Sequence, residues 1–134
     1  MTYVPEGNAI FYQSQALAWV LPLYRLTTTE HDVWNTMLGR MEDGGRVPLS
    51  RADIALRLNT APTNISPALS RLQELGLLWK VSADLWQINP NVAFKGTTEE
   101  WQEALDSVPA EVPPVPMPDH DVRPPRRRKK LSVA

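Results

Sequence analysis

Apolar residues recur at helical spacing through the first third of the chain. Residues 15–26 predict a short helix, which Pro22 should kink or end because its ring cannot continue the backbone hydrogen bonds. A Thr-x-x-Glu capping box at 27–30 predicts the start of a second helix, which should run through the apolar positions of 33–41. The two glycines at 44–45 are expected to end it.

Residues 50–76 contain two short helical patterns separated by a tight turn. A Ser-x-x-Asp capping box at 50–53 opens the first helix, and Pro62 suits the first position of the second. Asn59, in the turn, is one of the few residue types that tolerate a positive φ, and Gly76 should close the second helix. The apolar positions of the second helix fall on one stripe: Ile65, Ala68, Leu69, Leu72 and Leu75.

The rest of the chain predicts a β-hairpin, a last helix and a tail. Two apolar and aromatic runs, at 77–81 and 85–88, flank a short polar turn, as the strands of a hairpin do. A Thr-x-x-Glu capping box at 97–100 predicts a final helix that ends near residue 108. From Pro109 onward seven prolines fall within 17 residues and a basic cluster follows, so this segment has too few apolar side chains to order itself.

These elements predict a mainly α fold: a winged helix-turn-helix with a short two-stranded β-wing and flanking helices. The expected organisation is an irregular lead-in over residues 1–14, one domain over 15–108 and a disordered, Pro-rich basic tail over 109–134. A chain of 134 residues suffices for one modest hydrophobic core of this kind.

The sequence SRADIALRLN at residues 50–59, followed by ISPALSRLQELGLL at 65–78, resembles the winged helices of MarR-type transcription regulators. The stretch WQINPNVAFKG at 86–96 is similar to RepL-type plasmid replication proteins, whose wing strand runs into an Asn-Pro segment and then an aromatic residue, Lys or Arg, and Gly. The resemblance spans residues 24–105 and implies DNA binding through the second helix of the motif. The likeness to MarR-type proteins also implies a homodimer paired through terminal helices.

Pro67 departs from this resemblance, because such families carry an ordinary helix former inside the recognition helix. An interior proline costs about 3 kcal/mol and removes one backbone hydrogen bond. We therefore expect either a helix that begins late, capped by Ser66, or a kink on the side that faces the DNA groove.

The polar side of the second helix is the candidate surface for base contacts in the major groove. The candidate base contacts are Thr63, Asn64, Ser66, Pro67, Ser70 and Arg71. Among these, Arg71 has the donors to bond guanine bidentately. The alternative is a helix face that meets only water.

Phosphate contacts are expected from basic residues around the motif, namely Arg46, Arg51 and Lys80. A basic tail cluster is expected to add affinity that does not depend on DNA sequence, through Arg126, Arg127, Arg128, Lys129 and Lys130. Arg57 is instead interpreted as a residue that only pairs with Asp53, four residues before it. The alternative for the tail cluster is that it only solubilises the chain.

The net charge of −1 hides an uneven distribution. Residues 46–95 carry +3 and residues 109–134 another +3, whereas 1–45 carry −3 and 96–108 carry −4. Positive charge is therefore concentrated on the two-helix motif and the tail, as binding to a polyanion requires. The acids of the 96–108 segment are interpreted as the solvated face of the final helix.

The five tryptophans are candidates for packing. Trp79 and Trp86 on the hairpin are expected to belong to the core. Trp19, Trp34 and Trp101 lie on apolar helical faces, where they either fill the core or form a dimer interface.

Several classes of function lack the residues that they need. The chain has no cysteine and only two distant histidines, His31 and His120, so no disulfide, metal site or other cofactor is expected. No glycine-rich phosphate loop or nucleophile motif occurs, which argues against an enzyme. There is no N-terminal signal pattern, and the longest apolar stretch, 16–23, is too short to span a bilayer, so we expect a cytoplasmic protein without membrane contact.

Three functions remain open from the sequence. The first is a sequence-specific transcription regulator that binds double-stranded DNA at an operator, as a homodimer. The second is a plasmid or phage replication or maintenance protein that binds origin DNA with the same surface. The third is a protein-interaction module without DNA contact. The charge distribution favours the first two, and nothing in the sequence identifies an effector ligand.

Overall fold

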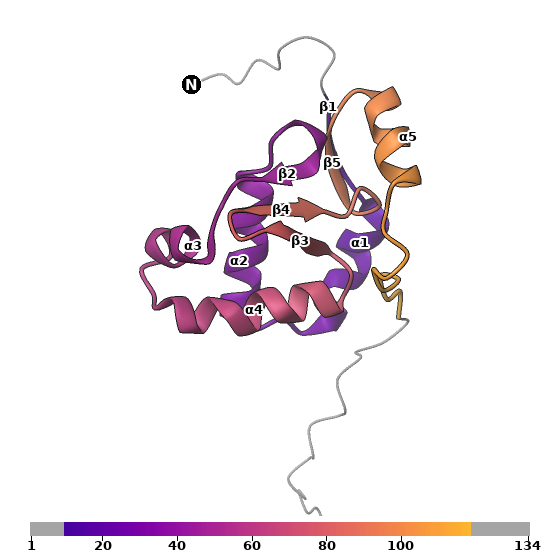
Figure 1. The fold of residues 1–134 in the computed structure, drawn as a ribbon. Coiled ribbons are helices and arrows are strands. Elements are labelled where there is room, and N and C mark those ends of the chain that lie inside the picture. Colours follow the sequence, from indigo (N-terminus) through magenta and orange to yellow (C-terminus); the bar gives the residue numbers. More distant parts are fainter. Residues whose placement is uncertain (1–9, 119–134) are drawn as a thin grey trace, which may run out of the picture.

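A computed structural model describes residues 10–118, in which five helices combine with two small antiparallel sheets (Figure 1). The helices are α1 (Gln15–Val20), α2 (Thr28–Gly39), α3 (Arg51–Arg57), α4 (Pro62–Glu74) and α5 (Thr98–Asp106), with 3₁₀ turns η1 (Leu21–Tyr24) and η2 (Asp43–Gly45). The strands are β1 (Ile10–Gln13), β2 (Arg46–Val47), β3 (Leu78–Ser82), β4 (Leu85–Ile88) and β5 (Ala93–Gly96).

Strands β3 and β4 form the expected hairpin, whose turn is at 83–84. Strand β2 pairs antiparallel with the other edge of β4, with Arg46 opposite Gln87 and Val47 opposite Trp86. The sheet order is therefore β2-β4-β3, so the predicted two-stranded hairpin is present and a third strand extends it. The third strand has only two residues, which is too short to show an alternating pattern in the sequence.

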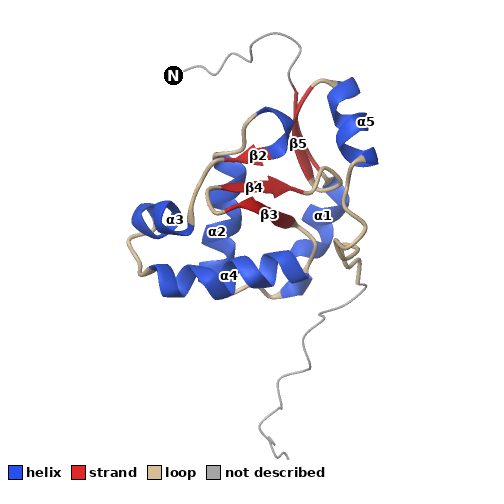
Figure 2. Ribbon diagram, viewed as in Figure 1, coloured by secondary structure: helices blue, strands red, loops and turns tan. Residues whose placement is uncertain are grey.

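Strands β1 and β5 form a separate antiparallel ribbon, with Phe11 opposite Lys95 and Tyr12 opposite Phe94. Figure 2 shows this ribbon beside the three-stranded sheet, with α5 next to β5. The irregular lead-in expected over 1–14 is therefore wrong at residues 10–13. Ile10, Phe11 and Tyr12 are residue types that favour a strand, but the segment that pairs with them lies at the other end of the domain.

One hydrophobic core joins the helices to the three-stranded sheet. Helix α4 contacts α2 and α3, and these helices lie on one side of the sheet (Figure 2). Fully buried side chains include Trp34 of α2, Tyr24 of η1, and Ile65 and Leu72 of α4. Because burying one large apolar side chain contributes about 1.5–3 kcal/mol, these contacts fix how α4 is rotated about its axis.

The capping signals in the sequence are confirmed. At Thr27, Ser50 and Thr97 the side-chain hydroxyl accepts a hydrogen bond from the backbone N–H three residues later. The carboxylate of that later residue accepts a hydrogen bond from the backbone N–H of the Thr or Ser. Asn59 has the positive φ of 53° that the turn requires, and Pro62 is the first residue of α4. These features depend only on neighbours in the sequence, which is why the sequence predicts them.

Of the two helix ends predicted from glycines, one is confirmed and the other is wrong. Gly76 follows α4 with a φ of 73°, as expected. Helix α2 ends at Gly39, so the expectation that the glycines at 44–45 end it is wrong. Met41 is buried although it lies beyond the helix, and apolar spacing does not distinguish such a residue from a helical one. The two glycines, with φ of 86° and 79°, instead turn the chain into β2.

Pro22 follows the end of a helix, whereas Pro67 lies inside one. Pro22 lies in η1, directly after α1 ends, as expected. Helix α4 begins at Pro62 and continues past Pro67, so a late start capped by Ser66 is wrong. Pro67 lacks the N–H that would bond the Thr63 carbonyl, and both residues are exposed, so water satisfies that carbonyl.

The segment 109–118 lies against the domain, which corrects the expectation that the tail is disordered from residue 109. The Tyr24 hydroxyl donates a hydrogen bond to the Pro116 carbonyl, and Val115 packs against the core. Burial raises the pKa of the Tyr24 hydroxyl above its ordinary value of 10.0, so it remains a donor at neutral pH. Residues 119–134, with the predicted basic cluster, lie outside the described part of the chain.

Replacing Tyr24 by Phe tests how the 109–118 segment is held. The ring stays in the core and only the hydrogen bond to Pro116 is lost, so the free energy of unfolding should fall by about 1 kcal/mol in urea denaturation. Tyr12→Phe is the matched control at an exposed ring, with an expected change below about 0.5 kcal/mol. Equal losses in the two variants would show that this hydrogen bond has no special weight.

Candidate nucleic-acid interface

Helix α4 has one buried and one exposed side. Its buried residues are Ile65, Ala68, Leu69 and Leu72, and its exposed residues include Thr63, Asn64, Pro67 and Ser70, with Ser66 half-buried at the edge. The exposed residues are small or medium-sized and mostly polar. A helix face of this kind can approach a second surface closely and present hydrogen-bonding groups to it.

Arg51, the first residue of α3, reaches across to α4. Its guanidinium donates a hydrogen bond of 2.7 Å to the Ser66 hydroxyl. The start of α3 is fixed by the capping box, in which the Asp53 carboxylate accepts from the Ser50 N–H at 2.9 Å. The hydrogen bonds from the Ser50 backbone and side chain lower the pKa of Asp53 below its ordinary value of 3.8.

A groove lies between α3, the polar edge of α4 and the β3–β4 hairpin. We call it the helix–hairpin groove; its volume is about 510 Å³. Its hydrogen-bonding side chains include those of Arg51, Ser66, Ser70, Gln73 and Lys80. Two of the three predicted phosphate contacts and two of the predicted base contacts therefore line one continuous surface.

Arg71 does not share this surface. Its Nη2 donates a hydrogen bond of 3.1 Å to the Tyr24 carbonyl, and the side chain is half-buried. Successive residues of an α-helix are rotated by about 100°, which places Arg71 on the flank away from Ser70. The guanidinium thus joins α4 to η1, so the structure places Arg71 apart from the residues of the helix–hairpin groove. Asn64 stays on the exposed side, where its amide donates to the Thr60 hydroxyl at 2.8 Å.

Arg46 is also separated from the helix–hairpin groove. It lies opposite Gln87, whereas Lys80 lies opposite Trp86 in the neighbouring row of the sheet. Because successive residues of a strand point to opposite faces, Arg46 and Lys80 project from opposite faces of the sheet. The predicted contacts Arg126, Arg127, Arg128, Lys129 and Lys130 lie outside the described residues.

Gln73 belongs to the groove but is absent from the sequence prediction. It follows Ser66 and Ser70 at spacings of seven and three residues, which is the periodicity of one helical flank. This helical spacing in the sequence could therefore have identified Gln73 as a residue of the same flank. Gln73 is half-buried, and its amide carries both a donor and an acceptor.

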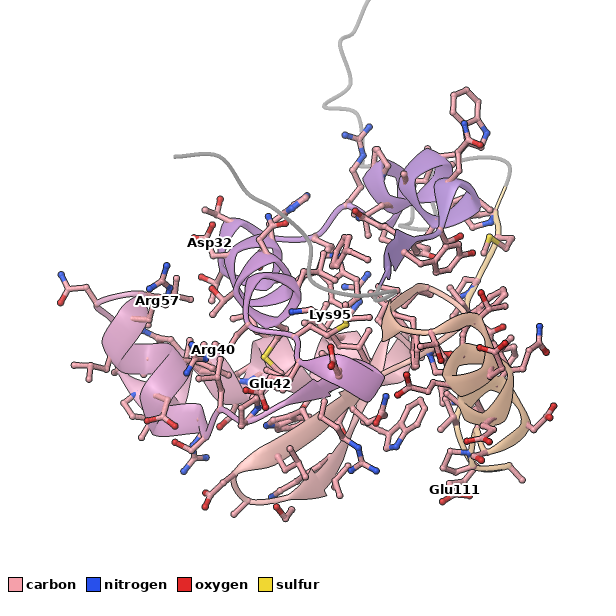
Figure 3. All side chains as sticks on the ribbon, turned by 90° about the horizontal axis from the view of Figure 1, so that it is seen from above. Asp32, Arg40, Glu42, Arg57, Lys95 and Glu111 are labelled. Carbon is pink, nitrogen blue, oxygen red and sulfur yellow. The ribbon has the colours of Figure 1, made fainter. Side chains whose placement is uncertain are left out.

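The charged ends of the molecule lie far apart. Figure 3 shows Arg57 on α3 at one end and Glu111, beside α5, at the other. The helix–hairpin groove includes one acid, Asp84 in the hairpin turn, and Glu74 is exposed at the C-terminal end of α4. Arg51 and Lys80 therefore lie along the same flank of the exposed α4 face, and Glu74 lies on that face at its C-terminal end.

The tryptophans have different environments. Trp34 and Trp86 are buried, as expected for core residues, and Trp79 is half-buried. The Trp101 ring lies 5.2 Å from that of Tyr12, and its Nε1 donates to the Pro90 carbonyl. Trp19 is 82% exposed, so it does not fill the core. It is the only one of the three helical tryptophans left exposed for a dimer interface.

Within residues 10–118, no group of three or more His, Cys, Asp or Glu side chains has the arrangement to hold a metal ion. None of the helices in the same range is long and apolar enough to cross a membrane.

Comparison of the chain with known protein families, with curated proteins and with solved structures gives no match. The functional assignment therefore depends on the surface described above.

The shifted pKa of Asp53 predicts a pH-dependent contribution of the α3 capping box. A lowered pKa means that the carboxylate stabilises the fold above pH 3.8 and that this stabilisation is lost as the pH falls through the lower, folded-state pKa. We expect Asp53→Asn to be less stable than the wild type at pH 7 and the difference to narrow below pH 3.8 in denaturation series. A difference that stays constant over the acidic range would contradict the assignment, and Ser50→Ala should reduce the effect.

Proposed function

We propose that this chain is a winged helix-turn-helix protein that binds double-stranded DNA through α4. The observation that carries the proposal is the exposed, small and polar face of α4, with Arg51 and Lys80 together in the groove along one flank of that face. The buried stripe of Ile65 and Leu72 prevents α4 from turning this face inward.

The order of elements supports the proposal. Helix, short strand, two helices and a hairpin follow one another as α2, β2, α3, α4, β3 and β4, and the strand order is β2-β4-β3. In a winged helix the second helix of the two-helix motif enters the major groove and the hairpin lies beside it. Asn59, with its positive φ, occupies the tight turn of that motif.

The dimensions of α4 also support the proposal. A helix of 13 residues is about 20 Å long, and the major groove, about 12 Å wide, admits an α-helix. Thr63, Asn64 and Ser70 would face base edges, to which their hydroxyl and amide groups can donate or accept hydrogen bonds. Pro67, on the same side, adds an apolar surface of the kind that contacts a thymine methyl group.

Arg51 and Lys80 are suited to contacts with DNA phosphates along one flank of α4. The hydrogen bond between Arg51 and Ser66 leaves the other guanidinium N–H groups for a phosphate and limits the conformations of the side chain. Lys80 is exposed at the hairpin, where a point charge meets the backbone without a fixed geometry. Both contacts position the protein, and neither selects a sequence.

We assign the chain to sequence-specific regulation of transcription. A plasmid or phage replication protein would use the same α4 surface, so the position of the preferred site in DNA separates the two roles. The decisive experiment is selection of bound duplexes from a random pool, followed by footprinting of the selected sequence. A preferred sequence near a promoter supports regulation, and one in a repeated origin region supports replication. Absence of duplex binding at low salt would overturn DNA binding and favour a protein-interaction module.

Arg51 and Arg40 form a matched pair for testing the interface. Arg51→Ala should weaken binding and lower the slope of log affinity against log salt by about 1, because one phosphate contact is lost. Arg40→Ala removes the same side chain from an exposed position after α2, outside the helix–hairpin groove, and should leave both quantities unchanged. The measurement is fluorescence anisotropy of the selected duplex over a salt series. Equal effects of the two substitutions would show that general charge, and not the α4 surface, binds DNA.

We also propose that the protein is a homodimer paired through α1. The supporting observation is Trp19 of α1, whose side chain is 82% exposed. In the sequence, α1 is distant from the elements that form the helix–hairpin groove. An exposed tryptophan of this kind is typical of interface hot spots. A two-fold dimer would place two copies of α4 on half-sites one helical turn apart.

Trp19→Gln should raise the dimer dissociation constant by roughly 30-fold, which corresponds to about 2 kcal/mol. Sedimentation equilibrium measures this change. Leu56→Gln is the control, because Leu56 is 83% exposed on α3. If both variants have the same association state as the wild type, Trp19 is not part of the dimer interface.

A further inference from the structure

The face of the three-stranded sheet that bears Arg46 forms a second groove together with α5 and the segment after it. Apolar side chains contribute Trp79, Val81, Pro90 and Phe94 to this groove, and carboxylates contribute Asp43, Glu100, Glu103 and Glu111. Its volume is about 690 Å³. We call it the α5 groove.

The apolar part of the α5 groove is incompletely covered within residues 10–118. Val81 is 45% exposed and Trp79 is half-buried, and both lie on β3, an edge strand of the three-stranded sheet. An uncovered aromatic and aliphatic sheet face loses the stabilisation that burial would provide. A segment that covers it would therefore gain free energy from apolar contact as well as from charge.

The charge of the α5 groove is negative. Glu103, Glu111 and Asp43 are exposed, whereas Glu100 already accepts the Thr97 N–H in the capping box of α5. Two basic residues also line the groove, namely Arg46 on this face and Lys80 on the edge strand β3, which borders the helix–hairpin groove as well. Four carboxylates against two bases leave an excess of two negative charges, so the groove favours a cationic occupant.

We propose that the α5 groove binds the chain's own basic segment, residues 126–130 (RRRKK). Arginine is suited to both parts of the groove, because a guanidinium stacks on an indole face such as that of Trp79 and bonds carboxylates bidentately. Neither an acidic peptide nor a nucleic acid has this complementarity.

The length of the chain permits this contact. Glu111 lines the groove and Pro118, the last described residue, follows it by seven residues, so the two are at most about 25 Å apart. Eight more residues lead from Pro118 to the first arginine of the basic segment, and an extended chain of that length spans up to about 28 Å. The basic segment therefore reaches the groove of its own chain.

This docking gives the tail two alternative binding surfaces, a consequence that rests on the proposed DNA binding. The α5 groove holds the basic segment when DNA is absent, and phosphates compete for the same arginines when DNA is present. The groove then lowers non-specific DNA affinity, because binding the tail to DNA first requires its release.

The absence of cysteine from the sequence allows a direct test without DNA. A spin label on Ala134→Cys should broaden the amide signals of Trp79, Val81 and Glu103 in ¹⁵N spectra of the full chain, and added salt should reverse the broadening. Glu103→Gln with Glu111→Gln should abolish it. The control, Glu99→Gln with Asp106→Asn, changes exposed acids of α5 outside the groove and should preserve it.

Each other outcome overturns the proposal. Signals that do not broaden show that the groove is empty of the tail. If the control variant loses the broadening to the same extent, the tail is attracted to the acidic surface in general and does not bind at a defined site. Broadening that appears only when labelled and unlabelled chains are mixed assigns the groove to a second copy. Since no step uses DNA, failure here leaves the proposed function of α4 untouched, and failure of duplex binding leaves this test valid.

Discussion

The burial of one stripe of α4 is the constraint on which the rest of the structure depends. Ile65, Leu69 and Leu72 are almost fully buried, and α2 and α3 both pack against them. Any rotation of α4 about its axis would expose these side chains at a cost of about 1.5–3 kcal/mol each. The same burial therefore determines which side chains remain outside, and Thr63 and Ser70 are exposed because the apolar residues are not.

Local and non-local interactions explain how much the sequence predicts. The capping boxes, the positive φ of Asn59 and the start of α4 at Pro62 all involve residues at most three positions apart, and the sequence predicts each of them. Strand β1 has the strand-favouring residues Ile10, Phe11 and Tyr12, but its pairing with β5 and the contact between Tyr24 and Pro116 join distant segments, which no local pattern reveals. The exposed face of α4 was predictable because it is the complement of a periodic apolar stripe.

The candidate interface shows the same division at the level of single residues. Exposure of Thr63 and Asn64 follows from helical spacing, whereas the position of Arg71 depends on a carbonyl 47 residues away. Arg46 and Lys80 look equivalent in the sequence, but the strand register places them on opposite faces. Residue type thus identifies candidates for phosphate contact, and only strand pairing decides which of them share a surface.

The separation of charge within the domain is the last consequence of this architecture. Helix α5 places its carboxylates beside the sheet face that bears Arg46, while Arg51 and Lys80 line the groove beside α4. If the acids of α5 surrounded α4, they would repel phosphates at the distances where steering acts, which are about 10 Å at moderate salt. Residues 10–118 carry eight basic and twelve acidic side chains, a formal charge of −4, so this domain favours a polyanion only where Arg51 and Lys80 lie nearer to it than the carboxylates of α5.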